Sequence, residues 1–137
     1  MSHQKLSPDD WVDRFYNQHP KLKKWRPEVE LREGSGEARQ QGAAIFLFPK
    51  FWKLPPTTKN FVFTHEIGHF VLRGRYPELL KVAQDRGVDV WDTSSLPYSQ
   101  FNGEEAFADC FASYILTPQE LHDRYPQWVS IVQHMMR

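Results

Sequence analysis

The sequence has one cysteine, no excess of charge of either sign and no long apolar run, and each absence argues against a class of protein. Cys110 alone cannot form an internal disulfide, and this usage fits a reducing compartment, so we expect a cytoplasmic protein. Basic and acidic residues both total 17, so the zero net charge makes a nucleic-acid partner unlikely on electrostatic grounds. No stretch has the length and apolar character of a membrane span, and no basic start precedes an apolar segment, so we expect neither a membrane protein nor a classically secreted one.

The length and the hydrophobic pattern predict one small α+β domain over residues 1–137, with a single hydrophobic core. Ser7 is placed to cap an amphipathic helix that runs to about Gln18. Residues 29–32 alternate apolar and polar side chains, and residues 43–48 form a more apolar run, so both segments predict strands. We expect these two strands to form a small antiparallel sheet that precedes a central helix.

A His-Glu-x-x-His motif, His65 to His69, lies in an apolar run that predicts a helix over residues 57–72. In that helix the two histidines lie one turn apart on one face. Their imidazoles can therefore bind a single Zn²⁺ ion, as this motif does in metalloproteases. Glu66 lies about 100° around the helix from His65, so its carboxylate can reach a water on the metal rather than the metal itself. The motif predicts a zinc site that still needs a third protein ligand.

The residues around the motif predict that its helix is buried at the centre of the domain, because apolar side chains lie all round it. Gly68 lies between the two histidines although glycine lowers helix propensity, so we expect a neighbouring element to approach closely there. Gly74 is placed to end the helix. Residues 76–86 predict a short helix, and residues 87–102 predict an irregular loop of a length that is often functional.

A second apolar helix, predicted over residues 102–116, carries acids that can complete the site. Glu105 and Asp109 share one helix face, and burial of two acids in an apolar helix is costly unless they are paired or bind metal. Glu105 can complete a His-His-Glu zinc set that leaves the fourth position for water. Asp109 is then placed to accept a hydrogen bond from a ligand imidazole and so to set its tautomer. Glu104 is the rival ligand, although the spacing to Asp109 favours Glu105.

The His65–His69 motif and the downstream pattern Glu105-x-x-Ala108-Asp109, which continues to Pro118, resemble the gluzincin metallopeptidases. More narrowly, the chain is similar to the small peptidases of the ImmA/IrrE type and to the single-domain minigluzincins. The resemblance is specific over residues 65–118 and only architectural before them. It implies a minimal zincin-like domain with an N-terminal helix, a small sheet, a zinc helix, a glutamate helix and a C-terminal helix.

The resemblance also implies an activity and a role for each motif residue. The implied zinc ligands are His65, His69 and Glu105. Glu66 would be the general base that accepts a proton from the activated water and later delivers it to the leaving amine. Asp109 would orient the first histidine, and the register of the family favours Glu105 over Glu104. The chain would then be a zinc-dependent metalloendopeptidase that hydrolyses peptide bonds.

Two further side chains are candidates for stabilising the oxyanion of the transition state. Tyr98 precedes the glutamate helix, and His122 follows Pro118 at the start of a predicted last helix, where an exposed surface role is the simpler interpretation. A peptide or protein substrate would bind in extended form along the sheet edge near residues 45–48, through main-chain hydrogen bonds.

Two alternatives remain open for the biological role. Proteins of the ImmA/IrrE type act on helix-turn-helix repressors, so the chain could bind such a regulator, with cleavage secondary or absent. Minigluzincins are described as latent zymogens whose C-terminal segment blocks the cleft, and residues 118–137 are the corresponding segment here.

Overall fold

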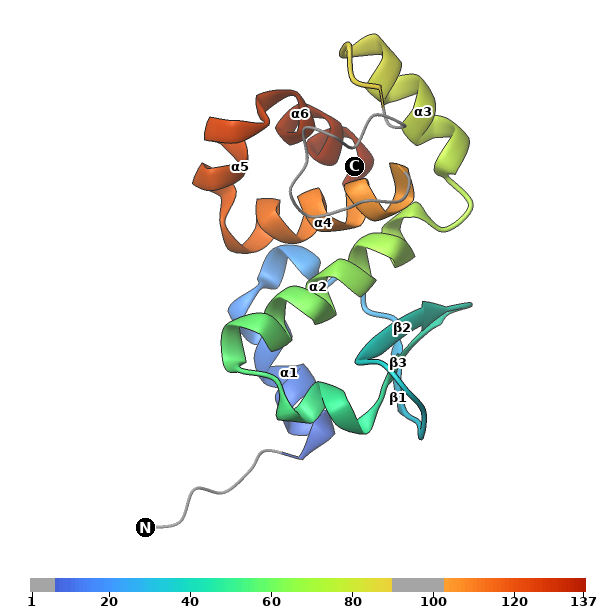
Figure 1. The fold of residues 1–137 in the computed structure, drawn as a ribbon, viewed down its shortest axis with the longest axis vertical. Helices are drawn as coiled ribbons and strands as arrows, with labels where there is room; N and C mark the ends of the chain where they lie inside the picture. The colour runs from blue at the N-terminus through green and yellow to red at the C-terminus, as the bar shows by residue number, and fades with distance from the viewer. Residues whose placement is uncertain (1–6, 90–102) are drawn as a thin grey trace.

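The computed structural model describes residues 7–89 and 103–137, which form helices around one long central helix (Figure 1). The helices are α1 (Pro8–Gln18), α2 (Pro56–Leu72), α3 (Tyr76–Asp85), α4 (Gly103–Leu116), α5 (Pro118–Arg124) and α6 (Pro126–Met135). The strands are β1 (Glu28–Leu31), β2 (Ala38–Gln41) and β3 (Ala44–Leu47), and two short 3₁₀ helices are η1 (Pro20–Leu22) and η2 (Pro49–Lys53). The expectation of an α+β fold is therefore confirmed.

Helix α2 crosses the middle of the molecule, with α1 and the sheet on one side and α3 to α6 on the other (Figure 1). Its contacts are most extensive with α4 and then with β2. Phe63, Ile67 and Val71 are buried, as the apolar pattern of this segment predicts. The helix ends at Leu72, and Gly74 follows with φ +72°, a left-handed conformation that favours glycine after a helix. None of the helices in the described ranges has the length and apolar character needed to cross a membrane.

The N-terminal helix α1 begins and ends as the sequence predicts. Ser7 is its N-cap, and the Ser7 side chain accepts a hydrogen bond from the backbone N–H of Asp10 at 3.2 Å. Phe15 is buried and stacks edge-on against Phe63 of α2, with 4.9 Å between ring centroids. This aromatic contact anchors α1 to the central helix.

The sheet is mixed, so the expectation of a purely antiparallel sheet is wrong. The strand order is β1-β3-β2, and β1 pairs with β3 in parallel while β2 pairs with β3 antiparallel. The sequence pattern did not predict strand β2, because its four residues include a single apolar side chain, Ala38. The chain reverses at Gly42, where φ is +59°, and so returns β3 parallel to β1.

Because β3 is the central strand, both of its edges are paired with neighbours. The predicted substrate edge near residues 45–48 is therefore wrong, and the edge strands are β1 and β2. Ile45 and Leu47 of β3 are fully or almost fully buried, which explains why this segment has the most apolar strand pattern. Of the two edge strands, β2 is the one with extensive contacts to α2.

The C-terminal segment forms two helices where the sequence reading expected one. Proline lacks a backbone N–H, and Pro126 begins α6 after Tyr125 leaves the helical conformation with φ −139° and ψ 63°. Both helices pack on α4, and α6 also packs on α3. Trp128, Ile131 and Met135 belong to the hydrophobic core, so this segment contributes to the packing of the domain.

Candidate metal centre

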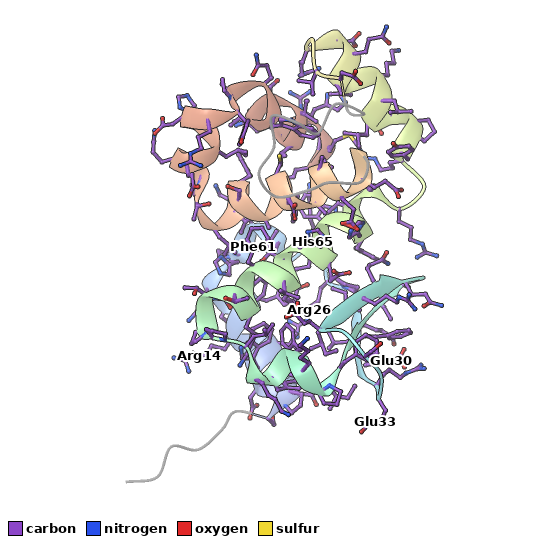
Figure 2. The ribbon with its side chains drawn as sticks, viewed as in Figure 1. Arg14, Arg26, Glu30, Glu33, Phe61 and His65 are labelled. Atoms are coloured by element: carbon purple, nitrogen blue, oxygen red, sulfur yellow. The ribbon has the colours of Figure 1, made fainter. Side chains whose placement is uncertain are left out.

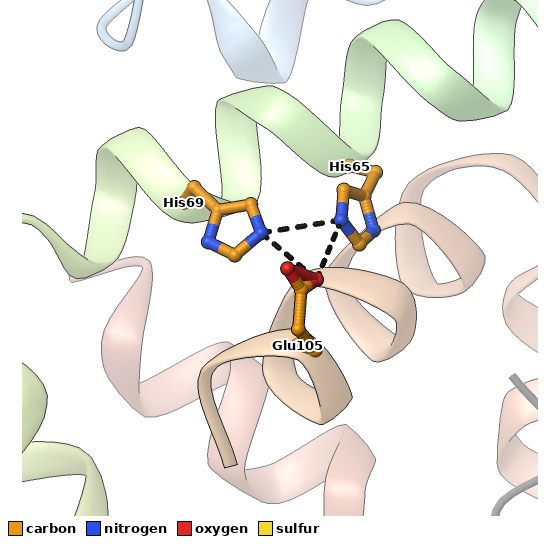
Figure 3. Close-up of side chains that lie close together, drawn as sticks. All are labelled: His65, His69 and Glu105. Atoms are coloured by element: carbon orange, nitrogen blue, oxygen red, sulfur yellow. Dashed lines mark hydrogen bonds and ion pairs between the residues drawn. The ribbon is translucent and has the colours of Figure 1, made fainter. Parts of the chain in front are cut away.

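His65 and His69 extend from one face of α2 toward α4, as their spacing in the sequence predicts. Figure 2 labels His65 on the part of α2 that lies next to α4, and Figure 3 shows both imidazoles meeting the carboxylate of Glu105. The three side chains are each partly buried, and one potential ligand atom from each lies within 4.8 Å of the other two. The structure thus brings together the three residues that the sequence singled out as metal ligands.

The three ligand atoms form a nearly equilateral triangle. Nε2 of His65 and Nε2 of His69 are 3.2 Å apart, and Oε2 of Glu105 lies 3.0 Å from the first and 3.1 Å from the second. Ligands that surround a tetrahedral zinc ion at about 2.05 Å lie roughly 3.3 Å from one another. The residues present therefore fit a small divalent cation held at tetrahedral spacing by two imidazoles and a carboxylate.

Asp109 holds the His65 ring in the orientation that metal binding needs. Nδ1 of His65 donates a hydrogen bond to Oδ1 of Asp109 at 2.7 Å, so Nε2 is the nitrogen that faces Glu105. Burial alone would lower the pKa of His65. The hydrogen bonds to Asp109 and Glu105 and the charges of Glu66 and Asp109 together outweigh burial and raise that pKa to about 10. The Glu105 carboxylate accepts hydrogen bonds from His65 and from His69, and both bonds lower the pKa of Glu105.

The site forms where α2 and α4 approach each other closely. Glu105 and Asp109 lie one turn apart on α4, and both reach the histidines of α2. Gly68 lies between those histidines, and the Cα of Ala108 lies 3.0 Å from the position that a Cβ on Gly68 would take. The close approach that the glycine predicts is therefore present, and α4 is the element that makes it.

Glu66 lies beside the cluster and does not belong to it. Its Oε2 is 4.0 Å from Nε2 of His65, while its Oε1 accepts a hydrogen bond from the backbone N–H of Gln40 at 2.7 Å. Burial raises the pKa of Glu66 above its ordinary value, against the charges of His65 and His69 and the Gln40 hydrogen bond. A carboxylate held in this way is better suited to accept a proton near neutral pH than an exposed one.

The cluster opens into a cleft of about 480 Å³. Its walls are residues 38–40 of β2, the last turns of α2 with the residues that follow, Tyr76 at the start of α3, and the first turn of α4. Glu66, His69 and Glu105 all line this cleft. An extended ligand could therefore lie between β2 and α4 within reach of the proposed metal position.

Two of the remaining candidates, Glu104 and His122, lie outside the cluster of ligand atoms. Glu104 is exposed and lines the cleft, but it is not part of the His65–His69–Glu105 cluster. His122 is exposed on α5, where its Nδ1 lies 3.4 Å from Oδ1 of the neighbouring Asp123. Tyr98 lies outside the described residues.

Two contributions to the cleft were missed by reasoning from the sequence. The backbone N–H of Gln40 contacts Glu66, and Arg73 lines the cleft one turn after His69. The spacing of Arg73 from His69, four residues, was available in the sequence as a signal. No side-chain pattern marks the Gln40 contact, since every residue other than proline has a backbone N–H.

No protein-family model matches the chain, and neither a curated protein nor a solved structure matches it. The geometry of the cluster and its cleft is therefore the basis for the function proposed below.

Proposed function

We propose that this protein is a zinc-dependent metallopeptidase of the gluzincin type, with a minimal zincin-like fold. The observation that carries the proposal is the triangle of ligand atoms from His65, His69 and Glu105 with a buried carboxylate, that of Glu66, beside it. A site with three protein ligands leaves a tetrahedral position open, as in catalytic zinc sites. A purely structural zinc site would more often be closed by four protein ligands, often cysteines, and this chain has one cysteine.

Each residue of the site has a role in the proposed hydrolysis. When bound, zinc would lower the pKa of a water molecule and polarise the carbonyl of the substrate peptide. Glu66 accepts the proton of the attacking water and delivers it to the nitrogen of the leaving amine. Asp109 keeps the Nδ1 proton on His65, so that Nε2 remains available as a ligand. The hydrogen bond from Gln40 holds the Glu66 carboxylate in the lining of the cleft.

The substrate is proposed to bind as an extended strand beside β2. Arg39 and Gln41 of β2 lie opposite Phe46 and Ala44 of β3, and the C=O of Glu37 accepts from the N–H of Phe48. Since an antiparallel strand alternates the direction of its peptide groups, those of Ala38 and Gln40 point away from β3. The Gln40 N–H meets Glu66, so this outer edge of β2 faces the cleft. A peptide that adds to this edge would cross the proposed metal position.

The first test is the metal content of the purified protein and of four variants. We expect about one zinc per chain, with loss in H65A, H69A and E105A and retention in E104A, the matched control one residue away. Cleavage of a complex mixture of peptides, read by mass spectrometry, should depend on that zinc. E66Q should bind zinc normally and lose cleavage, because glutamine cannot act as a general base.

Two results would count against the proposal. Absence of zinc from the wild-type protein, even after zinc is added, would mean that the cluster is not a metal site. A biological effect that persists in E66Q with zinc bound would instead favour the alternative in which the protein binds a regulator, such as a helix-turn-helix repressor, without cutting it.

A further inference from the structure

We propose that the cleft selects peptides that carry a carboxylate beside the bond to be cut, and that Arg73 is the main selecting residue, with Arg39 in support. This inference rests on the peptidase function proposed above. It concerns the part of the cleft that lies beyond the metal cluster, where the charged side chains of β2 and of the turn after α2 form the walls.

Arg73 continues the metal-binding face of α2 into the cleft. It is the C-cap residue of that helix and lies four residues after His69, so its backbone is about one helical turn, roughly 5.4 Å along the axis, beyond the second histidine. The side chain is exposed and lines the cleft. Within residues 7–89 and 103–137, no carboxylate lies within ion-pair distance of Arg73, so its guanidinium is available to a ligand.

Arg39 supplies a second guanidinium to the cleft, from β2. It precedes Gln40 on β2, and it too is exposed, lines the cleft and has no ion-pair partner in the part of the chain that the structure describes. A peptide beside β2 would therefore lie in a cleft lined by both Arg39 and Arg73. Guanidinium groups bind carboxylates with two parallel hydrogen bonds, which makes arginine well suited to recognise an acidic group.

The balance of charge in the cleft points the same way. A divalent cation would offset the two negative charges of Glu66 and Glu105. The charged side chains that remain in the described lining are Arg39, Arg73 and Glu104, which leave one net positive charge. Glu104 lies in the first turn of α4, next to the proposed metal ligand Glu105, and has no ion pair with Arg39 or Arg73 among the described residues. Its negative charge would repel a carboxylate, so binding of an acidic group would depend on contact with the guanidinium groups.

The part of the cleft lining that the structure describes offers little to an apolar side chain. Leu72, which lines it, is only 3% exposed, and Ala38 and Gly74 add small surfaces. The ring of Tyr76 is the largest apolar surface among the described lining residues. Burial and the negative charge of Glu104 both raise the pKa of the Tyr76 hydroxyl, so this ring has a charged neighbour. Selection by charge is therefore better supported than selection by a large apolar residue.

The test begins with the peptide mixture used above, with cleavage sites read by mass spectrometry. We expect Asp and Glu to be enriched next to the cut for the wild-type protein.

The best substrate is then made with Glu, Gln or Lys at the selected position. Exposed ion pairs contribute modestly, so the Glu peptide should exceed the Gln peptide by about threefold to fivefold in kcat/KM. R73E should reverse the order and prefer the Lys peptide, while K53E, an equal charge change at exposed Lys53 outside the cleft lining, should not.

A second measurement separates binding from turnover. The affinities of the Glu and Lys peptides, each labelled with a fluorophore, are measured by anisotropy on zinc-loaded E66Q and on the E66Q/R73E double variant. At equal zinc content, E66Q should bind the Glu peptide more tightly than the Lys peptide, and E66Q/R73E should show the reverse order. Each peptide is also made with a free and with an amidated C-terminus. Equal selection in both forms assigns the carboxylate to a side chain, and selection only in the free form assigns it to the chain terminus.

The outcomes distinguish this inference from the function on which it rests. Cleavage of the mixture without acidic enrichment, or an unchanged preference in R73E, would overturn the inference and leave the peptidase function standing. If the zinc-loaded protein cleaves no peptide at all, the peptidase function fails and the inference falls with it.

Discussion

Gly68 and Ala108 lie where the two helices that carry the candidate metal ligands, α2 and α4, approach each other closely. A Cβ at position 68 would lie 3.0 Å from the Cα of Ala108 and 3.2 Å from the Cβ of Phe111. Both distances are shorter than an ordinary van der Waals contact between carbons. The separation of α2 and α4, and with it the spacing of the ligand atoms from His65 and Glu105, therefore depends on the absence of a side chain at Gly68.

Replacement of Gly68 by alanine should destabilise the protein and weaken zinc binding. Alanine improves helix propensity by about 1 kcal/mol, but overpacking of a core contact costs about 1–3 kcal/mol, so we expect a net loss of about 1 kcal/mol. The helices would move apart and enlarge the ligand triangle. Denaturant unfolding gives the stability, and competition with a chelating dye gives the zinc affinity.

A matched control for this variant is G42A. Gly42 has φ +59° and no atom within 4 Å of an added Cβ, so alanine there is strained by its backbone alone. G42A should lose stability without a change in zinc affinity. Equal zinc affinities in G68A and the wild type would show that the helix spacing does not set the geometry of the site.

Asp109→Asn should weaken zinc binding by about 10–100-fold and leave the fold intact. Asparagine keeps the shape of the side chain but loses the charge that orients and polarises the His65 ring through the 2.7 Å hydrogen bond. Zinc affinity is measured by competition with a chelator. D123N is the control, because Asp123 lies beside a histidine, His122, but both side chains are exposed. Equal zinc affinities of the D109N and D123N proteins would show that Asp109 does not contribute to zinc binding.

The backbone N–H of Gln40 should exchange with solvent deuterium more slowly than that of Ala38. Both groups lie on the outer edge of β2, but only the Gln40 N–H donates to a carboxylate, that of Glu66, at 2.7 Å. Amide exchange followed by NMR compares the two residues within one sample. E66A should abolish the difference, and equal rates in the wild-type protein would mean that Glu66 is not held by β2.

Removal of residues 118–137 should unfold the protein rather than activate it. Trp128, Ile131, Val132 and Met135 are at most 4% exposed. Burial of each contributes about 1.5–3 kcal/mol, so their loss would cost roughly 6–12 kcal/mol, comparable to the whole stability of about 5–15 kcal/mol. Circular dichroism and thermal unfolding measure the result. A truncated protein that stays folded and cleaves peptides faster would support the latent zymogen instead.

Local patterns in the sequence were sufficient to predict the helices that carry the site. The apolar run around His65 and His69 predicted a buried helix over residues 57–72, and the structure has it at 56–72. The spacing of Glu105 and Asp109 placed both acids on one face, and the structure brings that face against the histidines. A helix of 3.6 residues per turn determines from sequence spacing alone which of its side chains share a face, so the grouping of the histidines on one helix and of the acids on the other was predictable.

The sequence by itself thus determined which side chains could bind a metal, and the tertiary structure decided what lies around them. The pairing of β1 with β3, the place of β2 at the edge and the contact of Gln40 with Glu66 all depend on backbone N–H and C=O groups. Every residue other than proline has both groups, so residue identity does not record which strands pair. The presence of Arg39 and Arg73 in one cleft likewise follows from that pairing and from the packing of β2 on α2, which only the folded chain brings about.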